Sequence, residues 1–227
     1  MKMERKCVNG RCVMLLLMAW MMLGCGYTLA QKMTPAQKAA NAKRAKELFE
    51  TTFKKVYGEE GSRLTYSVNI IGVFKTSGTI YYKNGKERYD EKKITVWNDG
   101  KQYVRLNKPK ETIEIYASDD PERNSHSGAM KLNPDNYDYE LETEDGEYKI
   151  ELEAKKNVDG IKRLMLALDQ KSLVPKYLKL RFGIFSIKVQ LSNIKFGDIN
   201  DSLFDFPAEK YKGLKKIDHR TQNQKRK

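Results

Sequence analysis

The chain offers few side chains of the kinds that perform catalysis or bind metals. Beyond residue 30 it has two histidines, His126 and His219, and no cysteine, because Cys7, Cys12 and Cys25 all lie before that point. Zinc-ligand spacing and a thiolate nucleophile are therefore missing from most of the chain. The motifs of nucleophile elbows, zinc proteases, phosphate-binding loops and dinucleotide-binding folds are missing too. We therefore predict no catalytic residue, no metal site, no cofactor and no enzymatic activity.

The densest group of carboxylates, residues 140–145, could in principle supply an acid and a base for glycoside hydrolysis. These residues alternate with Tyr139 and Leu141, however. Carboxylates at every second position of a strand are most simply its solvent-facing side. We interpret the group as a hydrated strand face.

The first thirty residues have the three parts of a secretory signal. Basic residues precede the apolar run Val13–Gly24, and Thr28-Leu29-Ala30 offers small residues for a signal peptidase. The run is shorter than the roughly 20 apolar residues that span a bilayer. We therefore predict a signal peptide over 1–30 with cleavage near Ala30, a periplasmic domain over 31–220 and a basic disordered tail over 221–227. Alternatively, Met22-Leu-Gly-Cys25 resembles a lipobox, and lipidation of Cys25 would tether the protein to a membrane.

The chain is strongly basic, with a formal net charge of +13. Two interpretations stay open, since the lysines could attract anionic lipid surfaces or partners, or could simply hydrate strand faces. Tyrosines interleaved with lysines between Tyr66 and Tyr103 could stack on single-stranded nucleic acid. Tyrosine is also a favoured strand residue, and an exported protein rarely meets nucleic acid. We expect no nucleic-acid partner.

One long helix is predicted over residues 35–57. Thr34-Pro35 is a typical start and Gly58 a typical stop. Its apolar residues recur at three- and four-residue steps, so one face must pack on something apolar. The residues in this pattern are Ala42, Ala45, Phe49, Phe53 and Val56.

From Ser62 onward the apolar period changes to two, which is typical of strands with one buried face. Tight antiparallel turns are expected where Asn or Asp precedes Gly, at 84–85, 99–100, 145–146 and 159–160. About ten or eleven strands in consecutive hairpins favour a strongly curved sheet or barrel-like meander. The polar stretch 117–136 interrupts them, and a loop of that length is usually functional or disordered.

The apolar content of the later strands exceeds what one buried sheet face requires. The run 161–168 is apolar on both faces in its second half, and residues 178–191 add a dense apolar set. A single curved sheet of this composition needs either a second layer or a ligand to cover it.

The chain closes with Asp201-Ser-Leu-Phe-Asp-Phe206 and then Ile217-Asp-His-Arg220. Upstream it has Ser77-Gly-Thr-Ile80 and the hairpin Val96–Tyr103. In this order, these motifs resemble the closing Phe-x-Phe strand, the final Asp-x-Arg, the Gly-x-Leu/Ile strand and the Asp-Gly-Lys hairpin of the LolA-like periplasmic lipoprotein carriers and of the related acceptor LolB. The resemblance covers about residues 43–220. It departs at Lys83-Asn84-Gly85, where the family typically has Lys-Arg-Pro with a latching arginine.

The resemblance implies an α+β, mainly antiparallel fold: an incomplete, half-open β-barrel with an N-terminal amphipathic helix and lid elements over an apolar cavity. It implies a carrier that receives acylated lipoproteins from an inner-membrane ABC-type transporter and transfers them to an outer-membrane acceptor, and we expect it to be a monomer. The alternatives are a lipid-binding or sensor protein of the same fold, and an acceptor lipidated at Cys25. Alternation predicts that the cavity is lined by Phe49, Phe53, Leu64, Tyr66, Val68, Ile70, Ile80, Tyr82, Ile94, Val96, Leu164, Leu166, Leu178, Leu180 and Ile187.

Overall fold

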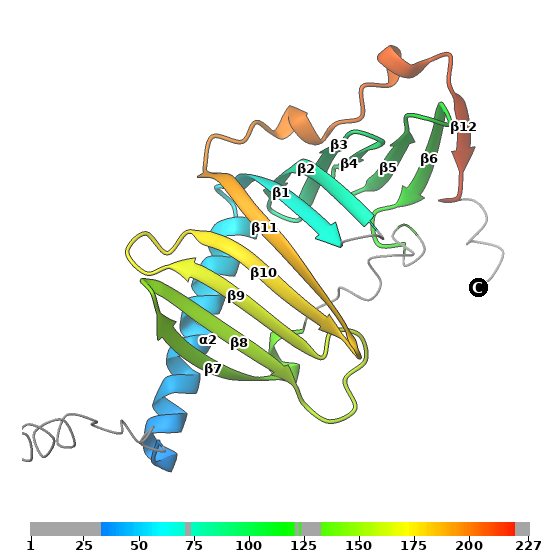
Figure 1. Ribbon diagram of the computed structural model, residues 1–227. Helices are drawn as coiled ribbons and strands as arrows, with labels where there is room; N and C mark the ends of the chain where they lie inside the picture. The colour runs from blue at the N-terminus through cyan, green and yellow to red at the C-terminus, as the bar shows by residue number, and fades with distance from the viewer. Residues whose placement is uncertain (1–32, 71–73, 121–122, 124–132, 221–227) are drawn as a thin grey trace, which may run out of the picture. The chain divides into compact units, whose positions relative to one another are not determined.

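The computed structural model describes residues 33–70, 74–120, 123 and 133–220 (Figure 1). The predicted signal, Cys25 and the predicted tail lie outside the described residues, as does most of the polar stretch 117–136. The fold described below is that of the compact unit beginning at Gln37. Among the described helices, none has the length and apolar content needed to cross a membrane.

The long helix, α2 (Pro35–Tyr57), begins and ends where its local signals predict. At its end the Gly58 amide donates to the Lys54 carbonyl at 2.9 Å. A side chain at Gly58 would meet that carbonyl, because a Cβ there would lie 2.3 Å from its oxygen. The helix buries Ala45, Leu48, Phe49, Thr52 and Val56, so one face packs and the opposite, lysine-rich face stays in solvent.

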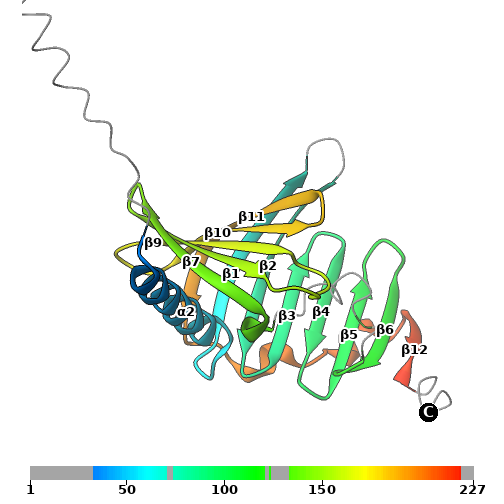
Figure 2. The same ribbon diagram turned by 90° about the horizontal axis from the view of Figure 1, so that it is seen from below.

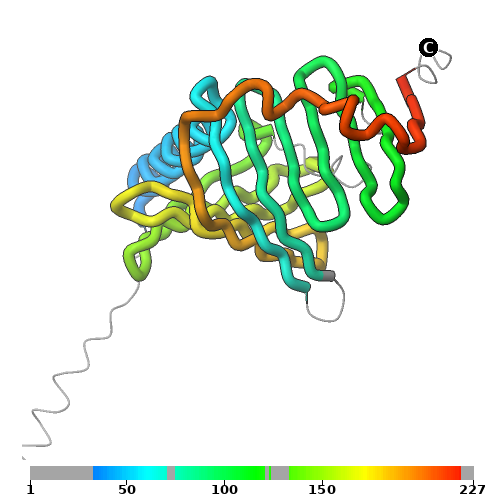
Figure 3. The backbone as a smooth tube through the Cα atoms, turned by 90° about the horizontal axis from the view of Figure 1, so that it is seen from above, coloured from blue at the N-terminus to red at the C-terminus, as the bar shows by residue number. Residues whose placement is uncertain are grey.

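Within the described residues, twelve strands form one sheet, in the order β12-β6-β5-β4-β3-β2-β1-β11-β10-β9-β8-β7. Every neighbouring pair is antiparallel except β12 and β6, which are parallel. Figures 2 and 3 show that the sheet curves without closing. The fold is therefore the open, incomplete β-barrel with an N-terminal helix that was predicted. The strands are β1 (Ser62–Ile70), β2 (Phe74–Lys83), β3 (Lys86–Glu91), β4 (Ile94–Asn98), β5 (Gln102–Asn107), β6 (Thr112–Ala117), β7 (Tyr137–Glu144), β8 (Glu147–Ala154), β9 (Arg163–Asp169), β10 (Pro175–Phe182), β11 (Phe185–Phe196) and β12 (Lys215–Asp218).

Two of the four expected turns are two-residue hairpin connections. Asn84 (φ 46°) and Gly85 (φ 78°) join β2 to β3, and Asp145 and Gly146 likewise have positive φ between β7 and β8. These angles are those of the type I′ turn, whose twist matches that of the flanking strands. The expectation was wrong at 159–160, because β8 and β9 are joined by the longer connection 155–162. The buried Ile161 holds that connection to the core, since its carbonyl accepts a hydrogen bond from the Tyr137 hydroxyl at 2.9 Å.

The C-terminal segment follows the outer face of the sheet, which is the face away from α2. After β11 come two short 3₁₀ helices, η4 (Asp201–Phe204) and η5 (Ala208–Tyr211), and then β12. The resemblance implied a strand at 201–206, and that was wrong. The Asn200 side chain accepts a hydrogen bond from the Ser202 amide and caps η4 as a helix. β12 was not predicted from its sequence, Lys-Lys-Ile-Asp.

This segment covers its own small core on the outer face. Trp97 and Val104 are buried there together with Leu106 and Ile113. The rings of Phe206 and Tyr211 lie 5.3 and 5.8 Å from the Trp97 ring, between centroids. The outer face of β4, β5 and β6 is thereby covered by the C-terminal segment.

Candidate functional site

The inner face of the sheet, on which α2 lies, carries a continuous apolar ladder. Strand registers place six apolar residues directly opposite one another across six strands. Directly opposed side chains in a sheet lie within contact distance of each other. The ladder thus forms an apolar band from β1 to β7. Its members are Val68, Val189, Leu178, Leu166, Ile150 and Leu141.

The helix covers only part of this band. Ala45, Leu48 and Phe49 of α2 belong to one cluster with buried residues of β7 to β10, such as Ile150 and Leu166. Burial there is almost complete, with Ile150 and Leu152 0% exposed. Helix α2 is therefore the second layer that the apolar composition of the later strands required.

Beside the helix, apolar residues of the band and their neighbours on the same face are only half-buried. We call the half-buried apolar inner-face residues of β1, β10 and β11 the open inner face. It continues the covered core without a break, since Leu178, Phe182 and Val189 pack against the same cluster. Half-buried apolar side chains in a continuous row are typical of a surface that receives an apolar partner. Its members are Val68, Ile70, Leu178, Phe182, Ile187, Val189 and Leu191.

All thirteen strand residues of the predicted cavity lining share the inner face by register. They divide into three groups. Val68, Ile70, Leu178 and Ile187 belong to the open inner face. Leu164, Leu166 and Leu180 lie in the cluster covered by α2, and Leu64 is buried on β1. The third group lies in or beside β2 to β4 and comprises Tyr66, Ile80, Tyr82, Ile94 and Val96.

The two helix residues of the prediction have different surroundings. Phe49 is 5% exposed and packs edge-on against Tyr139, with centroids 6.0 Å apart. Phe53 is 45% exposed, although it lies in the same periodic row. Its ring stacks on Phe49 and lies 4.4 Å from the Tyr57 ring. The aromatic contacts continue from Tyr57 to Tyr82 at 4.4 Å, so they lead from the covered core to the region of β2 and β3.

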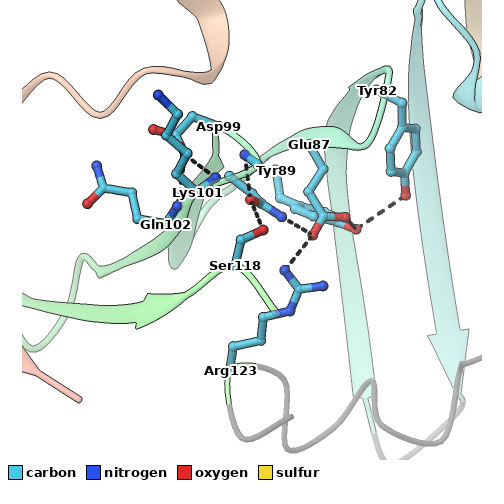
Figure 4. A network of polar contacts seen from close by, with 10 residues as sticks. Tyr82, Glu87, Tyr89, Asp99, Lys101, Gln102, Ser118 and Arg123 are labelled. Carbon is cyan, nitrogen blue, oxygen red and sulfur yellow. Dashed lines mark hydrogen bonds and ion pairs between the residues drawn. The ribbon is translucent and has the colours of Figure 1, made fainter. Parts of the chain in front are cut away.

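A polar network occupies the inner face beyond these rings (Figure 4). The half-buried Glu87 carboxylate accepts hydrogen bonds from the Tyr89 hydroxyl at 2.9 Å and the Asn98 amide at 3.2 Å. Arg123 lies on its other side at 4.0 Å. The Asn98 oxygen in turn accepts from the Ser118 hydroxyl at 2.8 Å. Further along, Arg105 and Glu114 form an ion pair, while Tyr66 donates to Glu91.

The tyrosines of this region remain protonated well above neutral pH. Burial raises the pKa of the Tyr82 hydroxyl, and the nearby Tyr57 and Tyr89 act in the same direction. Burial, followed by the Glu87 charge, raises the pKa of Tyr89. Both hydroxyls are therefore neutral hydrogen-bonding groups. The inner face is apolar from β1 to β7, whereas across β3 to β6 this polar network lies beside a buried cluster of Val96, Tyr103 and Tyr116.

The inner face presents apolar side chains beside hydrogen-bonding groups, which is the chemistry that an amphiphile needs. In the described part of the chain, no three His, Cys, Asp or Glu side chains gather as metal ligands would. A hollow of about 550 Å³ lies between β1, β2 and the start of the C-terminal segment, lined by Arg63, Tyr81, Lys195 and Leu203 among others. Arg63, Tyr81 and Lys195 point away from the inner face by register. None of its lining residues belongs to the predicted cavity.

Several inner-face residues were absent from the predicted lining. Phe182, Val189 and Leu191 follow the alternation of their strands and could have been included on that ground. Glu87 and Tyr89 gave no such signal. The alternating acidic and aromatic residues of β3 are also what a solvent-facing strand would have.

No protein-family model matches this sequence, and no curated protein matches it. Solved structures do resemble it. An uncharacterized conserved protein from Thermus thermophilus aligns with a TM-score of 0.55 and 11% identity, over 78% of this chain and 99% of that one. At this identity the similarity is one of fold.

Two further solved structures align with lower TM-scores. A LolA superfamily protein from Nitrosomonas europaea has a TM-score of 0.38 and 9% identity, covering 71% of this chain and 97% of that one. A putative outer membrane lipoprotein-sorting protein domain from Vibrio parahaemolyticus has a TM-score of 0.34 and 9% identity, over 73% and 97%.

Proposed function

We propose that this protein binds acyl chains on the open inner face and carries lipoproteins through the periplasm. The observation that carries the proposal is the continuous apolar band of the inner face, of which α2 covers only one part. A carrier needs an apolar surface that is preformed yet not filled by its own core. Of the residues predicted from the sequence, Leu166 lies in the covered part of the band, and Val68 and Leu178 lie in the open part.

The energetic need for such a surface is large. A sixteen-carbon acyl chain exposed to water costs on the order of 12 kcal/mol, at about 0.8 kcal/mol for each methylene. The acyl chains of a lipoprotein therefore cross an aqueous compartment only when they are covered. We place them along Val68, Val189 and Leu178, next to the edge of the helix-covered core.

The hydrogen-bonding groups of β2 and β3 give the amphiphile an orientation. Neutral hydroxyls of Tyr82 and Tyr89 and the Glu87 carboxylate lie beside the aromatic contacts that begin at Phe49. Hydrogen-bonding groups at one end of an apolar site fix the direction in which a ligand binds. We expect the polar end of the cargo to face β3, with its chains extending toward β11.

The binding step is tested by titrating the processed protein with a fluorescent fatty acid in detergent-free buffer. Val68→Glu places a charge in the open inner face and is expected to weaken binding at least about ten-fold, because the carboxylate must be desolvated. Ser67→Glu is the matched control, since Ser67 is the exposed neighbour on the outer face of the same strand. Equal affinities for the two variants, with both folded by circular dichroism, would contradict the proposed site.

The carrier step requires a separate test. Native mass spectrometry of the protein isolated from the periplasm without detergent is expected to release a tri-acylated peptide or a whole lipoprotein. In a deletion strain, outer-membrane lipoproteins are expected to accumulate in the inner membrane, where the proposed ABC-type transporter would supply them. Normal lipoprotein sorting in that strain would refute the carrier role while leaving acyl binding intact.

One observation favours the alternative of a lipid-binding or sensor protein. Asn84-Gly85 forms a hairpin turn where the carrier family typically has a latching arginine. The preceding Lys83 donates to the Ile199 carbonyl and pairs with Asp201, both at 2.8 Å. This region thus holds the C-terminal segment in place. Free phospholipid or glycolipid, released in the same mass spectrum without any lipoprotein, would select this alternative.

A further inference from the structure

The tip of the β10–β11 hairpin exposes two large apolar residues side by side. Ile184 is 88% exposed and Phe185 is 70% exposed. They follow Gly183, whose φ of +56° makes the turn. Monomeric proteins rarely present adjacent bulky apolar side chains on a projecting tip without a partner for them.

The exposure is not needed to build the hairpin. Turns of this kind are normally occupied by polar residues and glycine, as at Asn84-Gly85 and Asp145-Gly146 in this chain. Ile184 and Phe185 contribute little buried area to the fold, so substitutions there should leave the sheet intact. Their exposed apolar side chains are therefore free to contact an external partner.

Cationic side chains follow the apolar tip along both strands of the hairpin. The hairpin segment 175–196 contains five Lys or Arg residues and no Asp or Glu. Lys179 and Lys188 are directly opposite each other on the outer face, with both ammonium groups over the Tyr177 ring. In the described residues, neither lysine forms an ion pair with a carboxylate. Like charges placed opposite each other disfavour the pairing, so an anionic partner would relieve a cost already present.

We propose that the β10–β11 hairpin inserts its tip into an anionic lipid bilayer. Lys188 is three residues from Phe185, which is about 10 Å along an antiparallel strand. Interfacial segments bury apolar side chains about 5–10 Å into the boundary between headgroups and acyl chains. With the tip at that depth, the backbones of Lys179 and Lys188 lie at the level of the phosphates. Their long side chains rest over Tyr177 in the structure and turn toward the phosphates on binding, where each cation strengthens binding to an anionic surface.

The hairpin also connects the membrane with the open inner face. Phe182 and Phe185 are paired across the two strands, and the next inner-face residue, Ile187, is opposite Leu180. An acyl chain leaving the bilayer at the tip would therefore meet apolar side chains along its whole path. This entry route rests on the proposed function, whereas membrane insertion does not.

The insertion is tested by co-sedimentation with vesicles of phosphatidylcholine alone and with about 30% phosphatidylglycerol. The protein is recovered in processed form from cells expressing the full chain with Cys25→Ser, so that no lipid anchor contributes. Binding to the anionic vesicles is expected for this parent protein. The double variant Ile184→Ser/Phe185→Ser should lose at least about ten-fold in partitioning, while Ile184→Leu/Phe185→Leu should retain it.

Charge is tested in the same assay. Lys179→Gln/Lys188→Gln should lose about ten-fold or more on anionic vesicles and change little on neutral ones. The control Lys54→Gln/Lys55→Gln removes two exposed lysines from α2, and should behave like the parent protein within about two-fold.

A direct readout places the tip in the bilayer. Phe185→Trp should show a blue-shifted emission on vesicle binding and quenching by brominated acyl chains, while the buried Trp97 reports no change. Unchanged vesicle binding by Ile184→Ser/Phe185→Ser, or an unshifted emission of the introduced tryptophan on bound Phe185→Trp protein, would overturn the proposal. So would contact of the tip with a membrane protein and not with lipid.

The two proposals fail separately. In vesicle-free buffer, Ile184→Ser/Phe185→Ser should bind the fluorescent fatty acid within about two-fold of the parent protein, because the open inner face is intact. Val68→Glu should in turn still bind anionic vesicles. If the parent protein bound anionic vesicles but no fatty acid, the proposed function alone would be refuted.

Discussion

Substitutions at Phe49 and Phe53 separate an effect on the stability of the fold from an effect on ligand binding. The two residues lie one helical turn apart on α2, but Phe49 is 5% exposed and Phe53 is 45% exposed. Phe49 packs on Tyr139 within the covered core, while Phe53 contacts Phe49 and Tyr57 at its border. We predict that Phe49→Ala mainly destabilises the protein and that Phe53→Ala mainly weakens acyl binding.

The magnitudes follow from burial. Removing a buried phenylalanine costs about 3–5 kcal/mol of the free energy of unfolding, so Phe49→Ala should cost in this range. Full burial of a phenylalanine is worth about 1.5–3 kcal/mol. Somewhat less than half of the Phe53 side chain is still exposed, so a ligand that buried it would gain about 1 kcal/mol of binding free energy. That gain corresponds to about five-fold in Kd. Loss of the Phe53 ring should cost the fold only about 1–2 kcal/mol.

Urea unfolding measures the first quantity and titration with the fluorescent fatty acid measures the second. Both variants are compared with the unchanged protein at the same temperature, and the slope of each unfolding curve is checked for two-state behaviour. If Phe53→Ala destabilised the fold as much as Phe49→Ala, Phe53 would belong to the core. If its affinity for the fatty acid were unchanged, the ligand would not reach the border of α2.

Three further predictions concern the fold and its dependence on pH. Gly61→Ala should lower the free energy of unfolding in urea by about 2–4 kcal/mol, because its φ is +77° and a Cβ there would lie 2.7 Å from the Tyr82 carbonyl oxygen. Gly85→Ala is the control and should cost only about 1 kcal/mol, because the space around Gly85 is open. Burial raises the pKa of Tyr82 and Tyr89, so their contribution to stability is complete below about pH 10 and lost as pH rises toward the folded-state pKa. The part of the tyrosinate absorbance that is missing from Tyr82→Phe/Tyr89→Phe should appear together with unfolding, and its appearance in the folded protein near pH 10 would contradict this. Lys83 and Lys86 lower the pKa of the Asp201 carboxyl, so its contribution to stability is present above about pH 4 and lost as pH falls through the folded-state pKa. Below that pH the C-terminal segment should become more sensitive to pepsin, and Asp201→Asn should show the same sensitivity at every acidic pH.

The elements that were predicted correctly have local signals. The bounds of α2 follow from Thr34-Pro35 and Gly58, because a cap and a left-handed stop act on neighbouring backbone groups. The strands follow from period-two alternation. Asn84-Gly85 also fixes the register of β2 and β3, because a two-residue turn leaves one way to pair the strands.

The predictions from the sequence were wrong where contacts with distant residues determine the local structure. Asp159-Gly160 has the composition of a tight turn, but the hydrogen bond from Tyr137 to Ile161 and the burial of Ile161 favour a longer connection. The C-terminal segment is held by Lys83, more than a hundred residues earlier, through the Ile199 carbonyl. No local pattern in residues 198–218 predicts the contact with Lys83.

By itself, the sequence determined which residues share a face, because alternation along a strand is a property of each short segment. It therefore placed Val68, Leu166, Leu178 and Ile187 on one side of the sheet. Only the tertiary structure decided which of them α2 covers. That depends on where the helix lies against a sheet assembled from β1 and β11, strands more than a hundred residues apart, and contacts at such separations have no local code. The division between a filled core and an open apolar face, on which the proposed function rests, is therefore a result of packing.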